Sequence, residues 1–149
     1  MADSSPARLY CLLVGAVLVI AGIIGFFYSA SFAVGDEIKS DEVFDILAVN
    51  AWHNLVHIGI GGLLLIAAGG AARSGALFVG VLNLVLAGLG FVATGGDGIG
   101  FVAENNVLLD LVPVNDDDNW LHVILGVTGI IAAVATKKAA TSRVAPAAA

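Results

Sequence analysis

Charged residues are scarce in this sequence, and their scarcity excludes a soluble globular domain. Asp, Glu, Lys and Arg make up 12% of the 149 residues, whereas 59% are hydrophobic. Soluble proteins average about 25% charged and about 45–50% apolar residues. Charges are absent from four long segments when histidine is counted as neutral. Because a membrane-spanning helix needs about 20 apolar residues, we expect four spans, at residues 9–28, 51–70, 75–94 and 118–136.

Cysteine is nearly absent, which excludes the common sulfur-based sites. The single residue Cys11 permits no disulfide framework, no CxxC metal site and no CxxCH haem attachment. Catalytic motifs are missing as well, since the sequence contains no GxSxG, no P-loop and no Cys/His nucleophile arrangement. We therefore favour a protein without enzymatic activity.

Lysine and arginine are rare, and their positions predict the orientation in the membrane. Five of the six lie before span one, between spans two and three, or after span four. Cytoplasmic segments carry the excess of Lys and Arg, so we expect both termini in the cytoplasm. Eleven of the twelve acidic residues lie in or next to two loops, 30–49 and 95–117, which we expect outside. The few basic residues suit contact with the lipid bilayer and need no nucleic-acid partner.

An internal repeat with an offset of 65 residues organises the chain. VNAWHNLVHIGIGGLLLIAA at residues 49–68 recurs as VNDDDNWLHVILGVTGIIAA at residues 114–133. Seven of the 20 positions of residues 7–26 also recur at residues 72–91. Each copy crosses the membrane twice, so both copies run in the same sense. The expected fold is an all-α bundle of four transmembrane helices, built from two tandem parallel repeats.

This fold implies a single integral membrane domain, residues 1–149. The repeats span residues 7–68 and 72–133, and the tails, 1–7 and 139–149, should be flexible because their residues are small, polar or rich in Ala and Pro. Span one is longer than the 7–15 residues of a signal-peptide core and has a repeat partner, so we expect it to be retained.

The first outer loop and the start of span two carry local signals. In the loop, Val43, Phe44, Ile46 and Leu47 predict a short amphipathic helix on the membrane surface. Asn50 is a suitable N-cap for span two.

A stripe of polar side chains begins spans two and four. Residues at i, i+4 and i+7 share one face of a helix. Both stripes should face the interior, because unpaired polar groups are costly in lipid. In the simplest interpretation they bind no cofactor, and the amides and imidazoles hydrogen-bond each other and nearby backbone. The members of this polar intramembrane cluster are Asn50, Asn54, His57, Asn115, Asn119 and His122.

The two histidines of the stripes also suit ligation of haem. His57 and His122 lie at matching heights and could provide both axial ligands of a b-type haem. Gly61 and Gly126, four residues further on, could leave room for the macrocycle.

A third interpretation is a divalent transition metal. His53 and His57 form an i, i+4 pair on one helix, and His122 could add a third nitrogen for zinc or copper. His53 breaks the repeat symmetry, because Asp118 occupies its position in the second copy. Carboxylate ligands could come from Asp45, Asp110 or Asp118.

The pattern V-N-x-x-x-N-x-x-H-x-x-x-G, present as VNAWHNLVHIGIG and VNDDDNWLHVILG, resembles that of a bacterial family of small four-span membrane proteins. It is the domain-of-unknown-function family numbered 4383, and the resemblance covers residues 7–135. It implies a multi-pass protein of the bacterial cytoplasmic membrane, and it supplies no function, because the family has no assigned activity. The motif residues in this chain are Asn54, His57, Asn119 and His122.

Two functional hypotheses follow. The first is a structural or accessory subunit whose partners are other membrane-protein subunits. The second is a redox or metal-binding membrane protein that uses His57 and His122.

Overall fold

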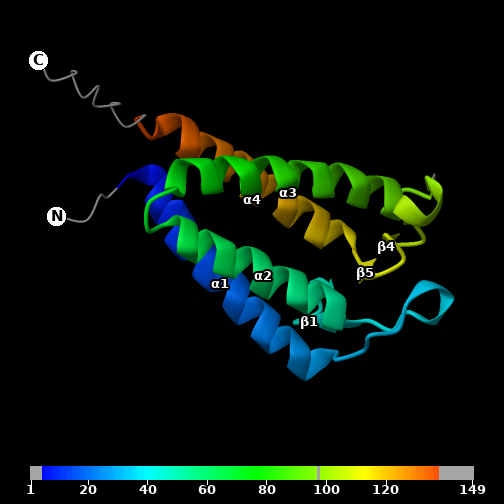
Figure 1. Ribbon diagram of the computed structural model, residues 1–149. Helices are drawn as coiled ribbons and strands as arrows, with labels where there is room; N and C mark the ends of the chain where they lie inside the picture. Colours follow the sequence, from blue (N-terminus) through cyan, green and yellow to red (C-terminus); the bar gives the residue numbers. More distant parts are fainter. Residues whose placement is uncertain (1–4, 97, 138–149) are drawn as a thin grey trace, which may run out of the picture.

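The computed structural model describes residues 5–96 and 98–137, and within these ranges it contains two antiparallel helical hairpins (Figure 1). Each helix boundary lies within three residues of the predicted span. The predicted tails lie outside the described residues, except that the first helix already begins at Pro6. The first hairpin consists of α1, Pro6–Tyr28, and α2, Ala51–Ala67; the second consists of α3, Ala72–Thr94, and α4, Asp116–Ala135.

Local sequence explains where these helices begin and end. The hydroxyl of Ser5 accepts a hydrogen bond from the Arg8 amide at 3.4 Å, with proline at the first helical position. The predicted N-cap Asn50 is confirmed, since its side chain accepts from the His53 amide at 2.9 Å. α2 ends three residues before the predicted boundary, because Gly69 and the residue after it form the turn into α3.

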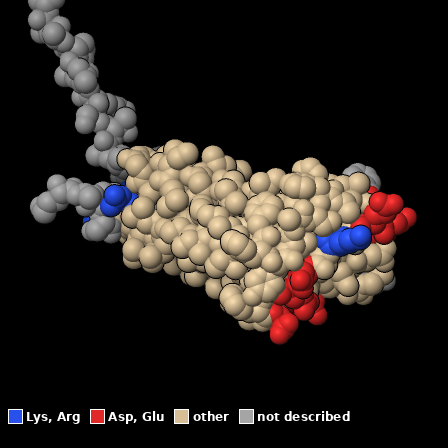
Figure 2. All heavy atoms as spheres, turned by 90° about the horizontal axis from the view of Figure 1, so that it is seen from below, with Lys and Arg blue, Asp and Glu red and all other residues tan. Residues whose placement is uncertain are grey.

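The outer surface of the helices is apolar enough to suit a membrane. α1, α3 and α4 are long and apolar enough to cross a membrane, whereas α2 is apolar but has 17 residues. Large apolar side chains such as Leu13, Ile66 and Val134 are exposed on the helices. Figure 2 shows basic side chains at one end of the face in view and mainly acidic ones at the other, with uncharged atoms between them.

The loops that follow α1 and α3 contain β-hairpins, which corrects two expectations. The predicted amphipathic helix in the first loop is wrong, because its residues form strands β1, Asp41–Val43, and β2, Leu47–Val49. The fold is therefore mostly helical rather than purely α. The second loop carries a three-stranded sheet made of β3, Ala103–Glu104, β4, Val107–Leu108, and β5, Val112–Pro113.

A tight turn explains the first hairpin. Phe44 and Asp45 have φ values of 56° and 57°, and the Ile46 amide donates to the Val43 carbonyl at 3.1 Å. Two successive residues with positive φ form the turn type whose twist suits a two-stranded hairpin. Asp tolerates this conformation, whereas Phe is an unusual residue for it.

The second loop repeats this turn 65 residues later. Leu109 and Asp110 have φ values of 55° and 52°, and the Leu111 amide donates to the Leu108 carbonyl at 3.0 Å. The strand registers correspond too, since Val43 pairs with Leu47 and Leu108 pairs with Val112.

Glycines bring the two helices of each hairpin close together. A Cβ atom at Gly61 would lie 2.7 Å from the Gly15 carbonyl oxygen, and one at Gly126 would lie 3.0 Å from that of Gly80. Between the hairpins, an apolar core fills the end of the bundle away from the loops. It includes Leu18, Leu64 and Val79 and ends towards the loops at a layer of polar side chains.

Candidate metal centre

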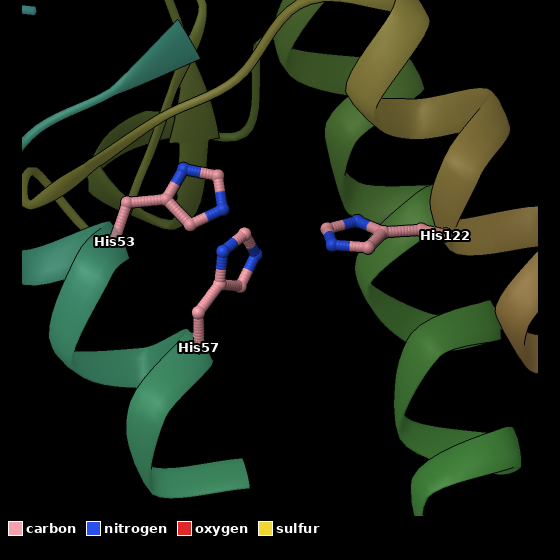
Figure 3. A group of neighbouring side chains, drawn as sticks. All are labelled: His53, His57 and His122. Carbon is pink, nitrogen blue, oxygen red and sulfur yellow. The ribbon is translucent and has the colours of Figure 1, made fainter. Parts of the chain in front are cut away.

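Four side chains from the first two turns of α2 and α4 meet between the hairpins. His53 and His57 point from α2 towards His122 of α4 (Figure 3). The three rings are buried, and one nitrogen of each lies within 4.8 Å of the others. Asp118, one turn before His122, is 0% exposed and lies beside His53. The centre thus combines three imidazoles and one carboxylate.

The centre has two layers that follow the 65-residue offset. His53 and Asp118 are equivalent in the two copies and form the outer layer, with 3.7 Å between Nε2 and Oδ2. His57 and His122 are also equivalent and form the inner layer. The asymmetry seen in the sequence therefore places an imidazole opposite a carboxylate.

The tautomer of His53 follows from its partner. Its Nδ1 lies 2.8 Å from the Ala48 carbonyl oxygen, which can only accept, so Nδ1 carries the proton and donates. In the neutral ring, Nε2 then has a free lone pair that points towards Asp118. A histidine that donates its second nitrogen to a backbone carbonyl is the usual arrangement of a metal ligand.

Asp118 is the least satisfied side chain of the centre. Among the described residues neither of its oxygens has a hydrogen-bond partner, and the same holds for Nδ1 of His122. A buried carboxylate without partners is costly and is normally paired or bound to a metal. A cation between Asp118 and the imidazoles would satisfy these lone pairs.

Asn50 and Asn115 each bond to the loop of the other hairpin, and we call this pair the asparagine cross-brace. Nδ2 of Asn50 donates to the Leu111 carbonyl at 2.6 Å, and Nδ2 of Asn115 donates to the Ile46 carbonyl at 2.8 Å. Each side-chain oxygen meanwhile caps its own helix, accepting from the amide of His53 or of Asp118. The residues that form the outer layer are thereby positioned by both loops.

Serine in place of Asn50 should test the cross-brace. Serine remains a good N-cap but is too short to reach Leu111, whose carbonyl would be left unpaired. We expect the free energy of unfolding, measured by SDS titration in mixed micelles, to fall by about 1–3 kcal/mol. Asn50→Ala should lower the free energy of unfolding by a further amount of about 1 kcal/mol, because it also removes the cap. Wild-type stability of Asn50→Ser would show that the cross-brace contributes nothing.

Asn54 and Asn119 act within their own hairpins rather than at the centre. Nδ2 of Asn54 donates to the Ser29 carbonyl at 2.9 Å, and that of Asn119 donates to the Thr94 hydroxyl at 3.3 Å. The bond of Asn54 to nearby backbone belongs to the predicted arrangement, whereas among the described residues no hydrogen bond joins either amide to His57 or His122. Each amide instead fills space left by a glycine of the partner helix, at positions 25 and 90.

Other residues proposed for the site lie elsewhere. Gly61 and Gly126 pack against α1 and α3 and do not line the cavity beside the histidines. Asp45 and Asp110 are exposed in the turns of the outer hairpins. Of the three candidate carboxylates, only Asp118 joins the histidines.

Sequence reasoning missed the main-chain partners of the site. The carbonyls of Ala48, Ile46 and Leu111 carry no residue-type signal, so nothing in the sequence marks them. Their positions depend on the β-hairpins, of which the first was predicted as a helix and the second was not predicted.

A family model described as "Domain of unknown function (DUF4383)" matches residues 8–135. The match covers both hairpins and every side chain of the centre. No curated protein and no solved structure matches the chain.

Proposed function

The chain belongs to the DUF4383 family, whose description assigns no activity, and we propose from its geometry that it is an integral membrane protein that binds a transition-metal ion between its two hairpins. One observation carries the proposal. Three imidazole nitrogens converge to within 4.8 Å beside a fully buried carboxylate that has no hydrogen-bond partner among the described residues and lies 3.7 Å from the nearest imidazole nitrogen. A proton can be shared by only two lone pairs, whereas a metal ion can accept lone pairs from four ligand atoms.

The ligand set fits a divalent first-row metal such as zinc. In a tetrahedral zinc site with metal–nitrogen bonds of about 2.0–2.1 Å, the nitrogens are about 3.4 Å apart. Small rotations of the three rings would bring their nitrogens to that spacing. Imidazole and carboxylate ligands suit Zn²⁺ or Cu²⁺, whereas Cu⁺ prefers thiolates or thioethers. Asp118 would reduce the net charge of the buried site.

The surroundings favour a bare ion over haem. The cavity beside the three histidines has a volume of about 140 Å³ and is lined mainly by apolar side chains. Pockets for drug-sized ligands measure about 300–1,000 Å³, and a haem is at least that large. The sequence-based pairing of His57 and His122 as haem ligands is therefore less well supported than a metal site that also uses His53.

We also propose a four-span arrangement with two tandem repeats in the bacterial cytoplasmic membrane. The equal turns and equal strand registers at the 65-residue offset support the repeat. α2 alone is about 26 Å long at 1.5 Å per residue, slightly less than a hydrocarbon core of about 30 Å, and β2 leads directly into it. The distribution of Lys and Arg supports cytoplasmic termini and an outside location of loops 30–49 and 95–117.

Metal analysis tests the proposal. The protein is purified in detergent without a histidine tag, stripped with chelator, and dialysed against Zn²⁺. We expect one zinc ion per chain. The Kd of His57→Ala and of His122→Ala should rise by more than the factor of about 10–100 that loss of an outer-shell partner costs. Thr128→Ala is the matched control, because Thr128 is an exposed polar residue of α4 whose hydroxyl bonds to its own helix.

The outcomes separate this function from the alternative. Substoichiometric zinc in the wild-type protein, or unchanged affinity in both histidine variants, would overturn metal binding. A structural or accessory role with other membrane-protein subunits as partners would then be the better hypothesis. Apparent melting temperatures of the stripped variants show whether each variant is folded, so that binding is compared between folded proteins only.

A further inference from the structure

A second, larger cavity opens at the loop end of the molecule. It has a volume of about 500 Å³ and lies between the outer segments of the two repeats. Acidic side chains are gathered at this end, as Figure 2 shows for the face in view. We call this cavity the acidic vestibule; the carboxylates that line it are Asp36, Glu42, Glu104 and Asp110.

The residues that form the floor of the vestibule also cover the histidine centre. Val114 lines both the vestibule and the cavity beside the three histidines. Ala48 lines the vestibule as well, and its carbonyl accepts the hydrogen bond from His53. A single layer of residues therefore separates the two cavities.

The route from the opposite end is much longer and is apolar. The core between the hairpins there consists of apolar side chains, among them Tyr10, Leu18, Leu64, Val79, Ala132 and Ala133. Asp118 is the only buried Asp, Glu, Lys or Arg in the part of the chain that the structure describes, and it lies at the loop end. Moving an ion through such a layer is costly.

Asp118 provides an independent indication of the direction. It is completely buried, its oxygens lack hydrogen-bond partners among the described residues, and it lies one helical turn closer to the vestibule than His122. A cation that passes the floor would meet this carboxylate before it reaches the inner layer of imidazoles.

We infer that divalent metal ions reach the histidine centre from the acidic vestibule, whose carboxylates concentrate them at the entrance. This inference rests on the proposed metal-binding function. The vestibule carboxylates raise the local cation concentration and so the rate of loading, as charged clefts do for oppositely charged ligands. The ion exchanges with the loop side only, which makes the centre a one-sided binding site rather than a transport path.

Rates of cobalt uptake test the route. Co²⁺ is mixed with stripped protein in nanodiscs. Its visible absorption is stronger with four ligands than in water, so the increase in absorption reports arrival at the histidines. The double variant Glu104→Gln/Asp110→Asn removes two vestibule charges. We expect uptake to slow by about tenfold or more at low ionic strength, and the difference should shrink at high salt because the carboxylates are screened. The final stoichiometry should remain one ion per chain.

A matched control removes the same number of charges outside the vestibule. Asp45 is the repeat equivalent of Asp110 and has the same left-handed backbone, which asparagine tolerates, but it does not line the vestibule. Asp41→Asn/Asp45→Asn should therefore load cobalt at nearly the wild-type rate. Equal rates for the wild-type protein and the vestibule variant, or equal slowing of both double variants, would overturn the route. Failure of the wild-type protein to bind cobalt would instead overturn the proposed function.

Discussion

Asparagine in place of Asp118 is expected to weaken zinc binding by about 100-fold or more and, at the same time, to stabilise the metal-free protein. Both effects arise from the same carboxylate, which is 0% exposed and has no hydrogen-bond partner among the described residues. In the metal-free protein it is a buried polar group whose desolvation is not compensated, which costs about 1–3 kcal/mol and more when the group is charged. In the metal-bound protein it is a ligand.

Unfolding measured with and without zinc distinguishes these effects. Free zinc at 100 times the Kd stabilises a folded protein by about 2.7 kcal/mol, and the wild-type protein should show this gain. Asp118→Asn should start from a higher stability without zinc and gain almost nothing at the same zinc concentration. Asp117→Asn is the control, since Asp117 is exposed on the same helical turn. A lower metal-free stability of Asp118→Asn would contradict the prediction, because it would make Asp118 a structural group.

Alanine at Gly61 and at Gly62 should have opposite effects on stability. A Cβ atom at Gly61 would lie 2.7 Å from the Gly15 carbonyl oxygen and 2.9 Å from the Val19 amide nitrogen, which are main-chain atoms that cannot rotate away. Overpacking of this kind costs about 1–3 kcal/mol. A Cβ atom at Gly62 meets nothing within 4 Å, so Gly62→Ala should gain up to about 1 kcal/mol from helix propensity.

The comparison uses neighbouring positions of one helix. SDS titration of Gly61→Ala, Gly62→Ala and the wild-type protein gives the two free-energy differences under the same conditions. Because Gly126 is the repeat equivalent of Gly61, Gly126→Ala provides a second test, although its nearest neighbour is the movable Leu84 side chain. Similar stabilities of Gly61→Ala and Gly62→Ala would show that the close approach of α1 and α2 does not contribute to stability.

The sequence predicted the helices because their signals are local. A run of apolar residues without charge predicts a helix long enough to span a membrane, and Asn50 before α2 marks the first residue of that helix. The boundaries accordingly agree with the structure to within three residues. The loop containing Phe44 and Asp45 was predicted wrongly because its apolar residues also suit an amphipathic helix. What decides the hairpin is a pair of residues with positive φ, a conformation that Phe rarely adopts and that residue type alone does not reveal.

For the candidate site, the sequence by itself determined which polar residues lie at which depth, because helical spacing converts residue number into height. It identified His53, His57 and His122, and it also identified Asp118 as the residue that breaks the repeat. Only the tertiary structure decided which of these side chains meet. The outer layer forms because two equivalent helix starts lie opposite each other, so a His in one copy faces an Asp in the other. The distance between His53 and Asp118 depends on how the hairpins pack, and packing involves atoms that are far apart in the chain.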